Sequence, residues 1–151
     1  MTDELDTYDT AILKAVSANG RITVTDLAER INLSKSPTQT RLRRLEKDGY
    51  IRGYTAQLNP VKLGLAHIAF VEVKLDDTRE KALKAFNVAV LMLPEIEQCH
   101  MIAGKFDYLL KVRTPDMRTY RRILGERVSA LPHVAHTSTH VVMEAVKEDA
   151  I

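Results

Sequence analysis

The sequence is poor in the residues that build disulfide-linked, fibrous or membrane-spanning proteins. It has one cysteine, eight aromatic residues, six glycines and five prolines among 151 residues. The single thiol, Cys99, excludes an internal disulfide framework and a zinc site made only of cysteines from one chain. The few glycines and prolines exclude a fibrous or low-complexity protein. No window of about 18 residues is apolar and uncharged, so we expect no membrane span.

The net charge is small, but the charged residues are unevenly distributed along the sequence. The amino-terminal segment is acidic and lacks the basic and apolar regions of a secretory signal, so we expect a cytoplasmic protein with no membrane partner. The formal net charge is only +2, yet the stretch from Arg30 to Arg52 holds seven cations and two anions, a local net charge of +5. A basic stretch on a nearly neutral protein predicts an anionic partner.

Three short helices are predicted in the first fifty residues. Apolar residues at helical spacing over 5–16 and 23–31 predict the first two, with Asp6 and Thr23 at the cap positions. The third begins near Ser34 or Ser36 and runs to Gly49. A packing helix, a second helix, a tight turn and a basic helix follow the helix-turn-helix plan, expected here at about residues 24–43.

The exposed face of the third predicted helix carries side chains suited to duplex DNA. Small hydroxyls and an amide can reach base edges in the major groove, while arginines and lysines neutralise phosphates. A solvated face with incidental charge is the alternative interpretation, and the helix-turn-helix order favours DNA. A strand is expected next, at Tyr50–Leu58. The predicted DNA-binding residues are Ser34, Lys35, Ser36, Gln39, Thr40, Arg43, Arg44 and Lys47.

The apolar pattern changes its period after the expected linker at residues 59–64. Strands are predicted at 66–75, 95–103, 106–113 and 134–143, and helices at 82–93 and 117–131, the second helix with Thr114 as its cap. This β-α-β-β-α-β order is that of a ferredoxin-like domain. The sequence therefore predicts an α+β protein with a helix-turn-helix domain at 1–60 and a ferredoxin-like domain at 61–151.

One face of the predicted sheet lacks a cover. Both helices of a ferredoxin-like domain pack on the same face of its sheet, while Ile68 and Phe70 point to the other face. A homodimer stacked through these sheets is the economical arrangement.

No motif typical of an enzyme or a metal centre is found. The chain has no P-loop, no G-x-G-x-x-G and no H-E-x-x-H. Cys99 and His100 are adjacent in a predicted strand and point to opposite faces, so they cannot form a nucleophile–base pair. The same alternation keeps His133 apart from His136 and His140, so three ligands cannot converge. We therefore expect no catalysis, no metal and no cofactor.

Taken together, the two halves resemble the Lrp/AsnC (leucine-responsive, feast/famine) family of transcriptional regulators. The resemblance covers nearly the whole chain in order. It rests in the first half on Leu5-Asp6-x-x-Asp9-x-x-Ile12-Leu13, Gly20-Arg21-Ile22, Leu27-Ala28, Leu33-Ser34-x-Ser36-Pro37, Arg41-Leu42-x-Arg44-Leu45-Glu46-x-x-Gly49-Tyr50-Ile51 and Gly53-Tyr54-x-Ala56-x-Leu58-Asn59-Pro60. In the second half it rests on Phe70-Val71-Glu72, Pro94-Glu95-Ile96, Cys99-His100, Gly104-x-Phe106-Asp107-Tyr108-Leu109-Leu110, Asp116-Met117-x-x-Tyr120-Arg121 and Val141-Val142-Met143-Glu144.

The resemblance implies a winged helix-turn-helix domain joined to an effector-binding and oligomerisation domain. It also implies dimers that assemble to tetramers or octamers, with free amino acids bound between dimers. Gly104 would leave backbone amides open to the ligand carboxylate, and Asp107 would hold its ammonium group. The leucine-responsive type carries Tyr where this chain has His140, which argues against leucine as the effector. The implied effector-binding residues are Met101, Gly104, Asp107, Met117, Thr139, His140 and Val141.

We therefore expect a sequence-specific DNA-binding transcription regulator that responds to an amino acid or a related metabolite and controls genes of amino-acid metabolism. Two alternatives remain. One is an architectural protein that wraps DNA without an effector. The other is a ferredoxin-like enzyme or metabolite-binding subunit with an accessory basic domain, and the missing catalytic pair counts against it.

Overall fold

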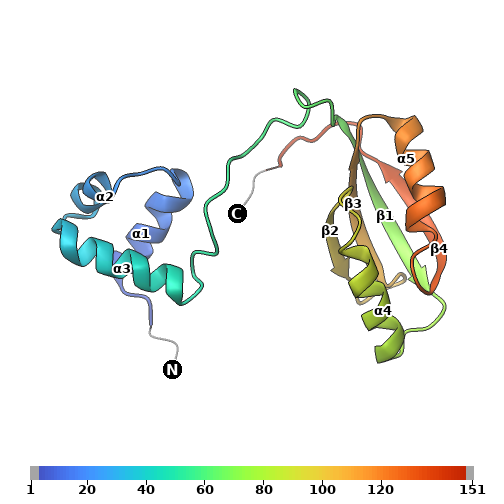
Figure 1. Ribbon diagram of the computed structural model, residues 1–151, viewed down its shortest axis with the longest axis horizontal. Helices are drawn as coiled ribbons and strands as arrows, with labels where there is room; N and C mark the ends of the chain where they lie inside the picture. The colour runs from blue at the N-terminus through green and yellow to red at the C-terminus, as the bar shows by residue number, and fades with distance from the viewer. Residues whose placement is uncertain (1–3, 149–151) are drawn as a thin grey trace. The chain divides into compact units, whose positions relative to one another are not determined.

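A computed structural model describes residues 4–148 and divides them into two compact units. The first ends at Leu58 and the second runs from Asn59 to Glu148 (Figure 1). The expected linker is a hydrogen-bonded turn of the second unit, in which the Leu65 amide donates to the Pro60 carbonyl oxygen over 2.8 Å. No helix within the described part of the chain is long and apolar enough to cross a membrane.

The amino-terminal unit consists of three helices with local start signals. The Asp6 side chain accepts a hydrogen bond from the Asp9 amide, and the Asp9 side chain accepts one from the Asp6 amide, which completes a capping box. Thr23 caps the second helix through the Asp26 amide, and Asn32 ends it in the left-handed conformation at φ 57°. The predicted helices are confirmed as α1 (Thr7–Ala18), α2 (Val24–Ile31) and α3 (Lys35–Lys47).

The helices enclose a small apolar core. Ile12 of α1, Leu27 of α2 and Leu45 of α3 are almost completely buried, and they pack in one cluster. Only Thr38 and Leu45 of α3 are buried, so α3 presents a narrow apolar face to its neighbours. Most of its circumference is left for other contacts.

The strand expected at Tyr50–Leu58 is wrong for the single chain. Residues 52–58 are extended but have no strand assignment, since no neighbouring strand of this chain pairs with their backbone groups. The segment is nevertheless attached to the helices, because the Tyr54 hydroxyl donates to Glu46 Oε1 over 2.8 Å.

The carboxy-terminal unit confirms the β-α-β-β-α-β order. Its four antiparallel strands are arranged β2-β3-β1-β4, and α4 and α5 lie on one face of the sheet (Figure 1). The last helix is capped by Asp116, which accepts from the Thr119 amide, and not by Thr114 as expected. A π-helical turn over Leu124–Val128 continues that helix. The elements are β1 (His67–Leu75), α4 (Glu80–Val90), β2 (Ile96–Met101), β3 (Tyr108–Thr114), α5 (Met117–Ile123) and β4 (Val134–Val141).

The two faces of the sheet differ in chemistry. Alternate residues of β1, among them Val71 and Val73, are buried against the helices. On the other face Ile68 lies beside Arg113 and Phe70 beside Lys111. That open face is therefore more polar than its β1 residues alone predicted. The two cations are more than nine-tenths buried and pair with two carboxylates, those of Glu97 and Glu148.

Candidate DNA interface and effector site

Helix α3 presents most of the predicted DNA-binding residues to solvent. Ser36, Thr40, Arg43 and Lys47 are exposed on the side opposite the buried Thr38 and Leu45. Ser34 and Lys35 are exposed at the start of the helix, and Gln39 is half-buried. The Thr40 hydroxyl donates to the Ser36 carbonyl oxygen over 3.1 Å, so its lone pairs remain available as acceptors.

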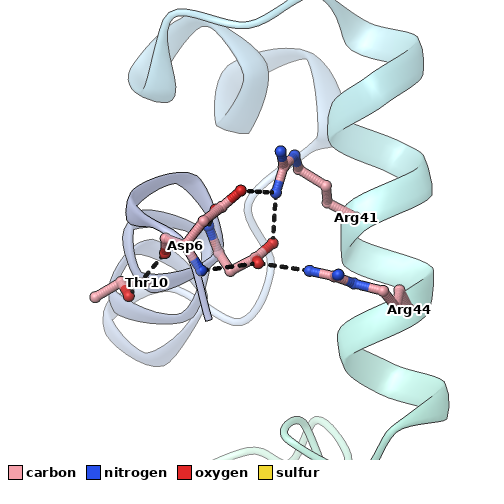
Figure 2. Close-up of polar contacts among 5 residues, drawn as sticks. Asp6, Thr10, Arg41 and Arg44 are labelled. Atoms are coloured by element: carbon pink, nitrogen blue, oxygen red, sulfur yellow. Dashed lines mark hydrogen bonds and ion pairs between the residues drawn. The ribbon is translucent and has the colours of Figure 1, made fainter. Parts of the chain in front are cut away.

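Arg44 is the exception among the predicted DNA-binding residues. It is half-buried, and its Nη2 lies 2.5 Å from Oδ2 of Asp9, on α1 (Figure 2). Arg41 also turns to α1, with its Nη1 2.9 Å from Asp9 Oδ1 and 2.7 Å from Asp6 Oδ2. This cluster is not among the contacts predicted from the sequence. Its signal in the sequence is a pair of acidic residues at the start of one helix and a pair of arginines three residues apart on a later helix.

The loop between β2 and β3 holds two of the implied effector residues, but its carboxylate is already engaged. Asp107 Oδ2 accepts from the Leu75 amide over 2.8 Å, and Oδ1 lies 3.3 Å from Lys74 Nζ. The Asp107 amide donates to the Val73 carbonyl oxygen. Gly104 does not adopt a left-handed conformation, and an added Cβ would make an ordinary contact with Ile102. The loop therefore needs no glycine for its backbone angles.

The other implied effector residues lie elsewhere on the same unit. Val141 pairs with Ala69 whereas Asp107 lies beside Val73, four residues along β1, which is about 13 Å at ~3.3 Å per residue. Thr139 points to the helix side, where its hydroxyl contacts that of Tyr120. His140 points to the open face, opposite Phe70. One chain therefore does not bring the seven residues together: Met101 is exposed beside the β2–β3 loop, where it pairs with Tyr108, and Met117 is exposed at the start of α5.

A pocket of about 180 Å³ lies beside the β2–β3 loop, on the open face of the sheet. Its members come from β1, β4 and the loop, so no stretch of sequence announced it. His140 Nε2 lies 3.3 Å from the carboxylate of Glu72, which links this implied residue to the edge of the pocket. The pocket is lined by Glu72, Lys74, Lys105, Phe106, His136 and Ser138.

Two other groups bear on the chemistry available. Burial raises the pKa of the Cys99 thiol, so this side chain is a poorer nucleophile than a free cysteine at neutral pH. Among residues 4–148 no three His, Cys, Asp or Glu side chains lie close enough to hold a metal ion.

Comparison with known proteins identifies both units. Residues 68–151 match the Lrp/AsnC ligand binding domain, and residues 5–52 match a winged helix-turn-helix DNA-binding domain. The chain belongs to the Lrp/AsnC family. It is a sequence-specific DNA-binding transcription regulator of that family, as the resemblance predicted.

The chain is similar in sequence to proteins named as transcriptional regulators, and the similarity covers almost the whole length of each. The chain is 62% identical to a proline dehydrogenase transcriptional activator from Rhizobium radiobacter, over 99% of this chain and 96% of the relative. A protein of the same name from Rhodobacter capsulatus is 57% identical, over 98% and 96%. The leucine-responsive regulatory protein of Escherichia coli K12 is 47% identical, over 96% and 88%.

Solved structures of the family share the fold. A transcriptional regulator from Neisseria meningitidis, solved as an L-methionine complex, has 32% identity and a TM-score of 0.90, with 96% of this chain and 94% of that chain covered. A feast or famine regulatory protein from Mycobacterium tuberculosis, also complexed with L-methionine, has 31% identity and a TM-score of 0.89, with 97% of each chain covered. The α+β class with an amino-terminal helix-turn-helix is therefore confirmed.

Proposed function

We propose that this regulator activates transcription of a proline dehydrogenase gene and that a free amino acid, L-proline first among them, controls it. The proposal is carried by the 62% identity to a proline dehydrogenase transcriptional activator over nearly the full length of both chains. The two family members solved with L-methionine support an amino acid as the class of ligand.

The chemistry of the β2–β3 loop supports the same class of ligand. An α-amino acid offers a carboxylate, an ammonium group and a small side chain. At this loop, Lys105 provides a cation for the carboxylate and Phe106 an apolar wall. Asp107 holds the loop to Leu75 and Lys74 and thereby positions Lys105 and Phe106 for the ligand.

The site we propose is completed by a second chain. Gly104 and Asp107 of one chain would face Met117, Thr139, His140 and Val141 of a neighbouring dimer. The separation of these groups within one chain supports an arrangement between chains. The homodimer would form through the open face and the unpaired Tyr54–Leu58 segment, with tetramers or octamers built from it.

A thermal-shift screen of the full chain against the twenty amino acids tests the ligand. Binding raises the stability of the folded state by RT ln(1 + [L]/Kd), so a true effector raises the melting temperature in a concentration-dependent way. Footprinting upstream of the proline dehydrogenase gene, with and without that amino acid, tests the target. Protection at this site together with no shift by any amino acid would favour the architectural alternative over an effector-controlled regulator.

A further inference from the structure

Among the described residues of the amino-terminal unit, the carboxylate of Asp9 is the most deeply buried charged group. Its side chain is only 1% exposed, and its two oxygens accept from Arg41, Arg44 and the Asp6 amide (Figure 2). Asp6 is a different case, because it is about half exposed, and its carboxylate accepts from the Asp9 amide and from the Arg41 nitrogen that Asp9 also contacts. A buried carboxylate is costly unless charged or hydrogen-bonding partners compensate it.

The two arginines point away from the predicted DNA-facing side. Arg41 and Arg44 are three residues apart and lie on the flank of α3 that faces α1. Arg41 also lies over the Tyr8 ring, with its guanidinium carbon 5.4 Å from the ring centre. The Asp9 cluster, defined as Asp6, Asp9, Arg41 and Arg44, thus fastens the middle of α3 to the first turn of α1.

Apolar packing holds α3 from one side only. Thr38 and Leu45 are its buried residues, and the half-buried Leu42 packs against the same core. Apolar contacts are non-directional, whereas ion pairs on the flank of the helix have a defined geometry and fix its rotation about its own axis, its roll. The roll angle decides which side chains of α3 enter the groove, and base contacts tolerate little displacement.

We propose that Asp9 is a positioning residue for DNA recognition. It sets the roll of α3 on α1, and it holds Arg41 and Arg44 as structural cations, so that phosphate contacts from this helix fall to Lys35, Arg43 and Lys47. Arg44 is thereby reassigned from the predicted phosphate contacts. The inference depends on DNA binding through α3 and is independent of the proline dehydrogenase target and of the ligand.

The substitution Asp9→Asn in the full chain tests the proposal. Binding is measured to a duplex selected by the wild-type protein from a random pool and to an unrelated duplex, well below the melting temperature of each variant. We expect the ratio of the two Kd values to fall by roughly tenfold, the size of losing one well-aligned base contact. Partial unfolding alone would weaken both duplexes equally and leave this ratio unchanged.

Asp26→Asn is the matched control, because it removes the same charge from an exposed position on α2 of the same unit. It should leave the ratio at the wild-type value. A folded Asp9→Asn variant with the wild-type ratio would overturn the proposal.

Arg44→Gln and Arg43→Gln keep the proposal testable where Asp9→Asn does not fold. Loss of a phosphate contact flattens the slope of log K against log salt by about 0.9. We expect that flattening for Arg43→Gln alone, and for Arg44→Gln a lower specificity ratio with the wild-type slope. An Arg44→Gln variant whose slope flattens by the same amount would show that Arg44 contacts phosphate and would overturn the assignment.

Discussion

The hydroxyl of Tyr54 donates a hydrogen bond of 2.8 Å to Oε1 of Glu46, near the end of helix α3. Tyr54 opens the segment through which we propose that two chains pair, so one bond joins that segment to the helix proposed to read DNA. The Tyr54 ring also lies 3.5 Å from the position of a Cβ on Gly20, at the turn after α1. Both contacts hold the extended segment against the amino-terminal unit.

The Tyr54–Glu46 bond predicts an unusual alkaline titration. Burial and then the hydrogen bond to the Glu46 carboxylate raise the pKa of Tyr54 from 10.0 to about 12. The bond stabilises the protonated phenol in the folded state, so its contribution is complete below pH 10 and is lost as the pH rises from about 10 to 12. Absorbance at 295 nm should show one more tyrosine ionising near pH 12 in the wild type than in Tyr54→Phe. Identical titration curves for the two proteins would contradict this.

Phosphate contacts by the exposed cations of α3 should be visible as salt dependence. Arg43→Ala and Lys47→Ala should each weaken binding to all duplexes to a similar extent, since phosphates carry no sequence information. Each should flatten the slope of log K against log salt by roughly 0.9. Fluorescence anisotropy measured from about 50 to about 200 mM salt gives both slopes, because the affinity changes strongly over this range. Wild-type slopes in both variants would show that this face does not meet the backbone.

Gln39 should contribute to specificity and little to salt dependence. Its amide can form a bidentate pair with one adenine, so Gln39→Ala should cost about 1–3 kcal/mol at a single base pair and leave other positions unchanged. Competition assays with a set of singly substituted duplexes would locate that position. Equal loss on every duplex in the set would instead point to a general disturbance of α3.

The open face of the sheet should mediate dimerisation. Light scattering at micromolar concentration should give a mass of about 34 kDa or a multiple of it, from 17.0 kDa per chain. Phe70→Lys would place an unpaired cation in the interface, and the cost of burying it should shift the protein to 17.0 kDa while circular dichroism stays native. A wild-type chain that scatters as a monomer would remove both this interface and the proposed intersubunit ligand site.

Asp107 should couple the ligand to assembly. Asp107→Ala removes the acceptor for the Leu75 amide and frees the β2–β3 loop, so the ligand-induced change in sedimentation should be lost. DNA affinity without ligand should stay close to the wild-type value, because the loop belongs to the other unit. Asp77→Ala, which removes a carboxylate paired with Arg79, is the control that should respond to the ligand normally. If Asp107→Ala responds to the ligand as the wild type does, the loop has only a structural role and the ligand binds elsewhere.

Neighbouring residues along the chain were enough to predict the fold class and every helix and strand except the strand expected at Tyr50–Leu58. Asp6 and Thr23 cap α1 and α2 through amides three residues away, and the alternation of apolar residues in β1 is a property of nine consecutive positions. Such signals depend on backbone geometry within one element, so the sequence by itself determined the order of helices and strands. It determined the family as well, because the matching motifs cover almost the whole chain.

Contacts between distant residues were decided only by the tertiary structure. Arg44 meets Asp9 across 35 positions, and the pocket brings Glu72, Lys105 and Ser138 together from three elements. The cap of α5 at Asp116 and the missing strand at Tyr50–Leu58 also depend on which backbone groups find partners. The local sequence around a helical arginine does not show whether the arginine contacts a phosphate or a buried carboxylate. Its partner is determined by how the helices pack, and not by its neighbours along the chain.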